Sequence, residues 1–243
     1  MTKSEMAAKL NEAQAFLPGK RVKIDFGGEE GVVMLDGNAN AVTEDGPIGA
    51  LKRFLPSGGL FDAALRGGMS LAKKDVEGVG TLLVDAEMKM FAGLKTPVIW
   101  LQNVVVDLLL GLKFYEAFAI FANHVKKQYG AEPGFITMNM PMLLDALDKV
   151  GVENPIVCSN INKIGFRMCG GLEAYDEALR TRQFRAVAMS VLASGAIPAR
   201  EAIEWVCRQP NVCSIVFGAS SAGNIRNTRD LVYEYWPDAA RAA

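Results

Sequence analysis

Cysteine, histidine and net charge are all scarce in this sequence. Its 243 residues include four cysteines and one histidine, and 26 Lys and Arg residues nearly balance 27 Asp and Glu residues. The cysteines form no C-x-x-C pair, which is typical of a reduced, cytosolic protein whose thiols pack as small core residues. The balanced charge argues against a nucleic-acid binder, because such a protein needs a basic face.

Long hydrophobic runs are also missing. The most apolar stretch, residues 98–112, is shorter than the roughly 20 residues of a membrane span and contains Gln102, Asn103 and Asp107. We interpret this stretch as a buried strand. Residues 1–20 carry charges throughout and lack the apolar segment of a secretory signal. We therefore expect a soluble, cytoplasmic protein with no membrane span.

Residues 1–96 form the first predicted region, which is of α+β type. Its opening residues have helical spacing that stops at Pro18 and Gly19. Residues 22–26 and 32–35 then have the composition of two strands joined by a glycine-rich turn, which predicts an antiparallel hairpin. For residues 80–91 two alternatives stay open, a third strand or a stretch that is helical in its second half.

Residues 97–243 form the second region, where apolar runs alternate with amphipathic stretches. The predicted strands are residues 104–110, 135–138, 156–158, 186–191 and 213–217, and the predicted helices are 115–129, 142–150, 172–179, 199–208 and 224–233. This alternation predicts an α/β fold with a (β/α) barrel-like parallel sheet. Five such units leave a barrel three strands short. Three alternatives stay open: oligomerisation closes the sheet, the hairpin interpretation is wrong, or the chain joins two pieces that did not pack together naturally.

The glycine-serine motif at residues 214–226, SIVFGASSAGNIR, is the most informative for chemistry. It combines the end of a buried strand, small hydroxyl residues and the start of a helix. Because a helix N-terminus presents free N–H groups to anions, a phosphate bound there would contact Ser220 and Ser221, with Arg226 nearby. The alternative is a loop whose serines only cap the helix.

Several segments around this motif resemble those of aldo/keto reductases. Residues 202–210, AIEWVCRQP, and 212–228 resemble the closing helix, strand and cofactor loop of that family. Upstream, residues 184–197, 136–162 and 106–110 resemble the family's Pro-Leu-Ala-x-Gly strand, its Asn-helix-strand segment and its fourth strand. The resemblance covers about residues 103–235 and implies a (β/α)₈ fold that binds NADP at the strand ends and reduces carbonyl compounds.

The same resemblance assigns roles to individual residues. It implies that the adenosine 2′-phosphate is held by Ser220, Ser221, Asn224 and Arg226, that Asn227 lies on the adenine side, and that Asn139 and Ser159 lie near the nicotinamide. The family's catalytic His is replaced by Gly111, and residues 1–96 contain no tyrosine for an Asp-Tyr-Lys set. Tyr115 is the nearest substitute for a proton donor, whose loss costs roughly 10²–10⁴-fold in rate.

The first 48 residues resemble a different family. Residues 22–27 and 31–46 are similar to the opening hairpin of sterol carrier protein-2-type lipid-binding domains. Three functions therefore stay open: an NADP-binding, aldo/keto reductase-like oxidoreductase with impaired catalysis, a non-enzymatic lipid or sterol-binding module, or an inactive barrel that serves only as an interaction surface. The ligand is accordingly a small carbonyl compound or a lipid, and we expect no metal.

Two groups of cations and one histidine complete the candidates. His124 lies beside Lys126 and Lys127 in a predicted helix, which favours a surface or half-buried residue over a catalytic one. Lys163 and Arg167 follow a predicted strand end. An anionic ligand and a solvated surface explain that pair equally well.

Overall fold

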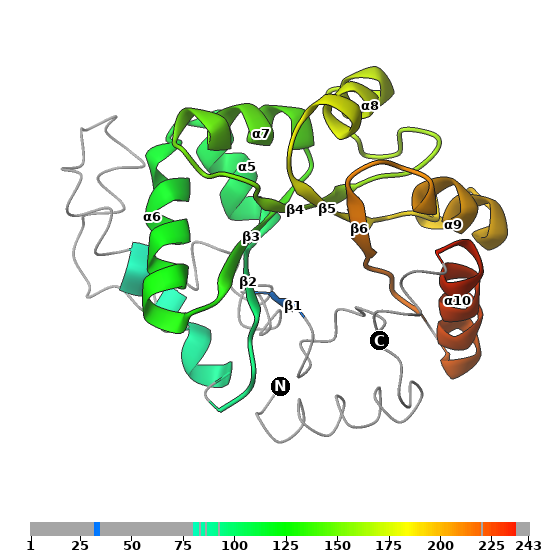
Figure 1. Cartoon of the computed structure of the whole chain (residues 1–243), viewed down its shortest axis with the longest axis horizontal. Coiled ribbons are helices and arrows are strands. Elements are labelled where there is room, and N and C mark those ends of the chain that lie inside the picture. Colours follow the sequence, from blue (N-terminus) through cyan, green and yellow to red (C-terminus); the bar gives the residue numbers. More distant parts are fainter. Residues whose placement is uncertain are drawn as a thin grey trace.

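A single parallel sheet organises the chain (Figure 1). The computed structural model describes residues 32–34, 80–82, 84–85, 87–91, 93–219 and 221–236. The strands are β1 (Val32–Met34), β2 (Val98–Leu101), β3 (Glu132–Thr137), β4 (Ile156–Asn160), β5 (Arg185–Met189) and β6 (Val212–Ile215). The helices are α5 (Asn103–Gly111), α6 (Glu116–His124), α7 (Met140–Lys149), α8 (Leu172–Thr181), α9 (Ala199–Cys207) and α10 (Ala222–Tyr235), with short turns η1 (Lys89–Phe91), η2 (Val125–Tyr129, a π-helix) and η3 (Ala193–Gly195).

The strand order follows the chain, β1-β2-β3-β4-β5-β6, and every neighbouring pair is parallel. Each crossover therefore moves one strand further in the same direction. Because such crossovers are right-handed, they place their helices on one face of the sheet, as in a barrel, whereas a doubly wound sheet reverses direction. Figure 1 shows α6 to α10 around the outside of the strands. The predicted α/β, barrel-like parallel sheet is confirmed.

Two apolar clusters cover the two faces of the sheet. Successive side chains of a strand point to opposite faces. Ile99 and Phe135 belong to the large cluster that contains the helices, while Trp100 and Ile136 belong to a small cluster whose described members come from the strands and the residue after β6. Phe135 packs edge-to-face on Phe118 of α6, with ring centroids 5.8 Å apart. The helices are thus held on the outer face and the small cluster fills the inner one.

Residues 98–112 differ from the sequence-based expectation. The strand predicted at 104–110 is wrong: β2 ends at Leu101 and the apolar run continues as helix α5. Val106 and Leu110 are buried one helical turn apart, while Val104 and Leu108 are exposed. A continuous apolar run does not distinguish strand from helix, and here it contains both. Among the described residues, no helix is long and apolar enough to cross a membrane.

The other four predicted strands and the five predicted helices are present with shifted ends. In the N-terminal region, the strand predicted at 32–35 is present as β1, which pairs in parallel with β2. Its predicted hairpin partner, residues 22–26, lies outside the described residues, as does most of the segment that resembles sterol carrier protein-2. The described part of 80–91 is helical rather than a strand, and it buries Val84, Met88 and Phe91 in the main core.

A polar cluster joins this N-terminal helical segment to α6. The Asp85 carboxylate lies 2.6 Å from Nε2 of His124 and accepts a 2.5 Å hydrogen bond from the Tyr129 hydroxyl. Burial alone would raise the pKa of Asp85, but the hydrogen bonds from Tyr129 and His124 outweigh it and hold that pKa below its ordinary value of 3.8. Burial and the nearby carboxylate raise the pKa of Tyr129. His124 is half-buried in a structural contact.

This cluster should make the stability depend on acidic pH. Because the pKa of Asp85 is lower in the folded chain, its contribution is complete above the unfolded value of 3.8 and is lost as pH falls through the folded value. We expect the free energy of unfolding to drop as the pH falls below the unfolded value of 3.8, and to drop less in Asp85→Asn. Asp176→Asn, in an exposed pair with Arg180, is the matched control. Identical pH profiles for all three proteins, by urea unfolding, would contradict this assignment.

Candidate functional site

A pocket of about 420 Å³ lies at the C-terminal ends of β5 and β6. Its floor comes from Met189 and Val216 at those strand ends, and one wall comes from Ser194 in the loop after β5. Gly218 after β6 and Thr228 of α10 line the other side. This volume is within the usual range for small-molecule sites, and functional sites of parallel barrels gather at this edge of the sheet.

The loop after β5 has an unusual backbone. Ser190, Ala193 and Ser194 all have positive φ angles, of 54°, 48° and 59°, although none of them is glycine. Such conformations cost of the order of 1–3 kcal/mol each and are concentrated at ligand-binding and active sites. Short backbone hydrogen bonds hold the loop, from Ala193 N to Ser190 O (2.9 Å) and from Gly195 N to Leu192 O (2.8 Å). A strained, rigid loop therefore forms one side of the pocket.

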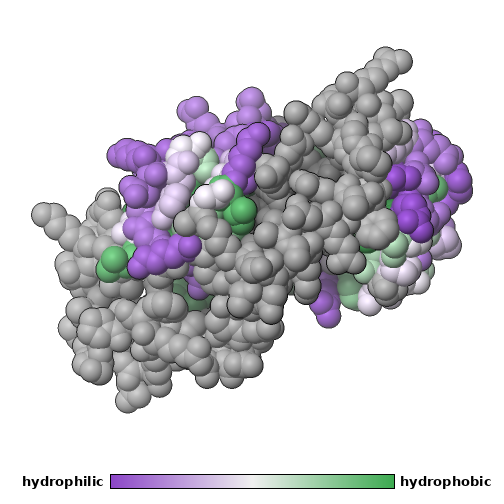
Figure 2. Space-filling model, turned by 90° about the horizontal axis from the view of Figure 1, so that it is seen from below, coloured by the Kyte–Doolittle hydropathy of each residue, from purple (hydrophilic) through white to green (hydrophobic). Residues whose placement is uncertain are grey.

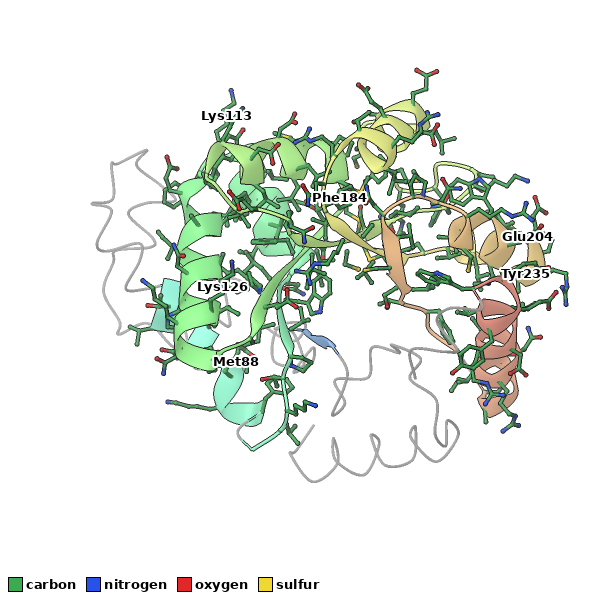
Figure 3. The ribbon with its side chains drawn as sticks, viewed as in Figure 1. Met88, Lys113, Lys126, Phe184, Glu204 and Tyr235 are labelled. Atoms are coloured by element: carbon green, nitrogen blue, oxygen red, sulfur yellow. The ribbon has the colours of Figure 1, made fainter. Side chains whose placement is uncertain are left out.

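Helix α10 forms the opposite side. Ser221 caps it, because its hydroxyl accepts the backbone N–H of Asn224 at 3.2 Å. Thr228, Leu231 and Val232 are its buried face. Near its C-terminal end, the hydroxyl of Tyr235 lies 2.7 Å from a guanidinium nitrogen of Arg200 on α9, and Figure 3 shows Tyr235 beside α9. The helix is thus fixed at both ends beside the pocket.

The predicted phosphate ligands do not all share one face of α10. At 100° per residue, Asn224 lies about 40° around the helix from Thr228, whereas Arg226 lies about 200° from it. Asn224, Arg226 and Asn227 are exposed. The structure therefore brings Ser221 and Asn224 to the end of the helix face that lines the pocket, and it directs Arg226 away from that face. Ser220 lies outside the described residues.

A second set of polar groups lies at the C-terminal end of β3. The carboxylate of Asp107, on α5, accepts a 2.6 Å hydrogen bond from the Thr137 hydroxyl and a 3.1 Å hydrogen bond from the Met138 N–H. Thr137 is fully buried, and its hydroxyl oxygen accepts the N–H of Asn139 at 2.9 Å. Asp107 thus fixes α5 on the end of β3. Sequence reasoning missed this contact because it assigned residues 104–110 to a strand.

Asn139 and Ser159, predicted near a nicotinamide, both lie at this edge. Asn139 is partly exposed and caps α7, because its side chain accepts the Met142 N–H at 3.3 Å. Ser159 is fully buried, donates to the Thr137 carbonyl at 2.9 Å and lies 3.0 Å from the Tyr175 hydroxyl. Burial raises the pKa of Tyr175. Asn139 faces the edge, whereas the hydroxyl of Ser159 is used inside the fold.

Tyr115, the predicted substitute acid, lies elsewhere. It precedes α6, and the ammonium nitrogen of Lys149 lies 5.4 Å from its ring centroid. Lys149 is the last residue of α7, whereas Asn139 caps the first turn of that helix. Because α7 runs away from the C-terminal edge of the sheet, Tyr115 is at the opposite end of this helix from the strand ends. The structure does not bring it together with the other predicted site residues.

The ionisable groups of the described edge are few. Asp107 is engaged by Thr137 and Met138, Tyr175 is buried, and Lys163 is paired with Glu201 at 2.7 Å. Arg167, in the loop after β4, is an exposed cation. Among the described residues, His, Cys, Asp and Glu side chains form no group of three with the arrangement of a metal site. The edge is therefore lined mainly by hydroxyl, amide and backbone groups, which bind and orient a ligand but do not supply a strong acid or base.

The chain resembles solved structures but no family model or curated protein. No protein-family model matches the sequence, and no curated protein matches it. Two solved structures described as candidate aldo-keto reductases of Pseudomonas aeruginosa are similar. The first is 16% identical, covers 65% of this chain and 60% of that chain, and has a TM-score of 0.48; the second is 14% identical, covers 65% and 59%, and has a TM-score of 0.43. The chain thus spans about three fifths of their length, and values this low assign no function.

Proposed function

We propose that the chain binds NADP(H) in the pocket between β5, β6 and α10 and acts as an aldo/keto reductase-like oxidoreductase of low turnover. The observation that carries the proposal is the pocket itself, bounded by the strained loop at Ser190–Gly195 and by the capped start of α10. The N-terminus of a helix favours phosphate groups because its first N–H groups are free and carry a partial positive charge. Apolar Met189, Val216 and Phe217 suit the less polar part of a nucleotide.

The residues fit this cofactor in two respects. Gly218 lines the pocket, and a Cβ added there would meet no atom within 4 Å, so the space beside it is open. Asn224 and Ser221 lie at the pocket-side start of α10, where amides and hydroxyls would contact a phosphate. NADPH supplies a hydride when bound. The chain's own residues would hold the nucleotide and, through Asn139, a carbonyl group.

Low turnover follows from the acid/base groups. Reduction of a carbonyl needs a proton for the new alkoxide, and a positioned acid is worth roughly 10²–10⁴-fold in rate. The described edge offers Asp107, whose carboxylate already accepts two hydrogen bonds, and Tyr175, whose pKa is raised by burial. Cofactor binding is therefore expected to be much more evident than catalysis.

Filling the pocket tests the proposal directly. Gly218→Leu adds a side chain into open space at a residue without a positive φ angle, so the fold should tolerate it while the pocket loses volume. We expect the affinity for NADPH, measured by calorimetry, to fall at least about tenfold with an unchanged melting temperature. Gly111→Leu is the matched control and should bind NADPH like the parent. The position is equally open, and Gly111 is the last residue of helix α5 rather than a residue that follows a strand, as the resemblance had implied.

Two results would reject the proposal. The first is that the parent protein does not bind NADPH at all. The second is that Gly218→Leu and Gly111→Leu both bind it with the parent's affinity, which would place the nucleotide away from this pocket.

A further inference from the structure

The loop between β4 and α8 is held by two buried asparagines. Asn162 is fully buried, and its side chain accepts the Phe166 N–H at 2.8 Å and donates to the Phe166 carbonyl at 2.9 Å. Asn160 is 1% exposed and donates to the carbonyl of Arg167 at 2.8 Å. Two interior amides are therefore used to fix the position of two neighbouring loop residues.

Arg167 is strained at this position. Its φ angle is 54°, in the left-handed region that favours glycine and costs other residues of the order of 1–3 kcal/mol. The hydrogen bond from Asn160 holds the carbonyl in this conformation. A glycine would occupy the position without strain, so an arginine at this position has a cost in stability. Strain of this kind is concentrated at sites that bind or clamp a ligand.

The guanidinium of Arg167 also differs from others in the described part of the chain. A carboxylate lies within salt-bridge distance of Arg180, Arg182, Arg185, Arg200, Arg208 and Arg229. Arg167 is exposed, has no carboxylate partner among the described residues, and lies over the Phe166 ring at 5.2 Å from its centroid. Stacking on an aromatic ring holds a guanidinium in place and leaves its N–H groups available for a bidentate anion.

Exposed apolar side chains lie on the same loop and beside it. Ile164 is 53% exposed and Leu172 is 41% exposed, and a Cβ added at Gly165 would lie 3.1 Å from Leu172. Figure 2 shows that the described surface seen from below is largely hydrophilic, with small separate apolar patches. Lys163 of the same loop pairs at 2.7 Å with Glu201 in the first turn of α9, a helix whose Ile203 lines the pocket. A cation and exposed apolar side chains are thus combined in the loop after β4, at the same edge of the sheet as the pocket.

We propose that Arg167 anchors the carboxylate of an organic acid whose apolar body lies against Ile164 and Leu172. The substrate class is accordingly a carbonyl compound that carries a carboxylate on an apolar or aromatic frame. The inference has two parts. The reduction of the carbonyl group rests on the proposed function, whereas the binding of the carboxylate by Arg167 does not. Binding alone therefore tests it, without NADPH.

The test compares 4-carboxybenzaldehyde with 4-formylbenzamide, its uncharged analogue of similar shape, by ligand-observed NMR on the full chain. We expect the parent to bind the carboxylate about tenfold more tightly than the amide, because a bidentate guanidinium contact is available only to the charged group. Arg167→Gln should bind the two compounds equally. Arg180→Gln, in an exposed pair on α8, is the matched control and should keep the parent's preference.

Arg167→Gly separates binding from folding. Glycine relieves the backbone strain, so this variant should melt at a temperature no lower than the parent while it loses the preference for the carboxylate. The inference is overturned if the parent does not bind the carboxylate, binds both compounds equally, or keeps its preference in Arg167→Gln or Arg167→Gly. A protein that fails to bind NADPH but prefers the carboxylate through Arg167 would reject the proposed function and leave this inference standing.

Discussion

Gly134→Val should lower the free energy of unfolding by about 3 kcal/mol, because the indole of Trp100 occupies the space of the new side chain. Gly134 of β3 is paired in register with Trp100 of β2, and a Cβ added at Gly134 would lie 2.5 Å from Cε3 of that indole. Trp100 is 1% exposed and is the largest member of the inner apolar cluster. The indole would therefore have to displace packed neighbours in order to make room for the new side chain. The φ angle at Gly134 is not positive, so lack of space is the whole cause.

Two further variants isolate that cause. Gly111→Val, where a Cβ meets nothing within 4 Å, should change stability by less than about 0.5 kcal/mol. In a Trp100→Leu background, Gly134→Val should cost much less than in the parent, because residues in contact are not additive. Equal costs in both backgrounds, measured by urea unfolding, would show that the indole is not what excludes the side chain.

Asn224→Asp should weaken NADPH binding by about tenfold to a hundredfold and leave NADH binding almost unchanged. The new carboxylate would lie in the first turn of α10. It would be on the same side of the helix as Thr228, which lines the pocket. It would repel the 2′-phosphate, which NADH lacks. An acidic residue in the first turn is favourable for the helix itself, so the melting temperature should not fall.

Arg226→Ala is the comparison that decides which face of α10 meets the phosphate. Arg226 is exposed and lies about 200° around the helix from Thr228, so its removal should change NADPH affinity by less than about threefold. The resemblance to aldo/keto reductases places Arg226 on the 2′-phosphate instead. A large loss of NADPH affinity in Arg226→Ala, with none in Asn224→Asp, would support that assignment against the helix geometry.

The sheet was largely predictable from the sequence because parallel strands buried on both faces are continuous apolar runs. Residues 156–158 stand out in this way and lie in β4, which is buried throughout. Of the predicted strand 213–217, residues 213–215 lie in β6, which ends at Ile215. The apolar run at 98–112 led to a wrong strand prediction, because it contains both β2 and α5, separated only by Gln102. β-branched Val104 and Val105 favour a strand, yet burial of Val106 and Leu110 one turn apart stabilises a helix.

The candidate site was predictable in position but not in detail. The motif at 214–226 correctly indicated a strand, a loop and a capped helix. The other wall of the pocket depends on positive φ angles at Ser190 and Ser194. Serine rarely adopts such angles, so the sequence does not predict this conformation. The contact of Ser159 with Tyr175, and that of Asp107 with Thr137, join residues far apart in the chain, so only the folded structure reveals them.

A crystal structure of the full chain with NADP⁺ tests the central claim most directly. The account predicts a nucleotide at the ends of β5 and β6, in contact with Ser194, Gly218 and Thr228, with its 2′-phosphate beside the first turn of α10. Crystals grown at saturating NADP⁺ that leave this pocket empty, or that hold the nucleotide at another place on the chain, would contradict it.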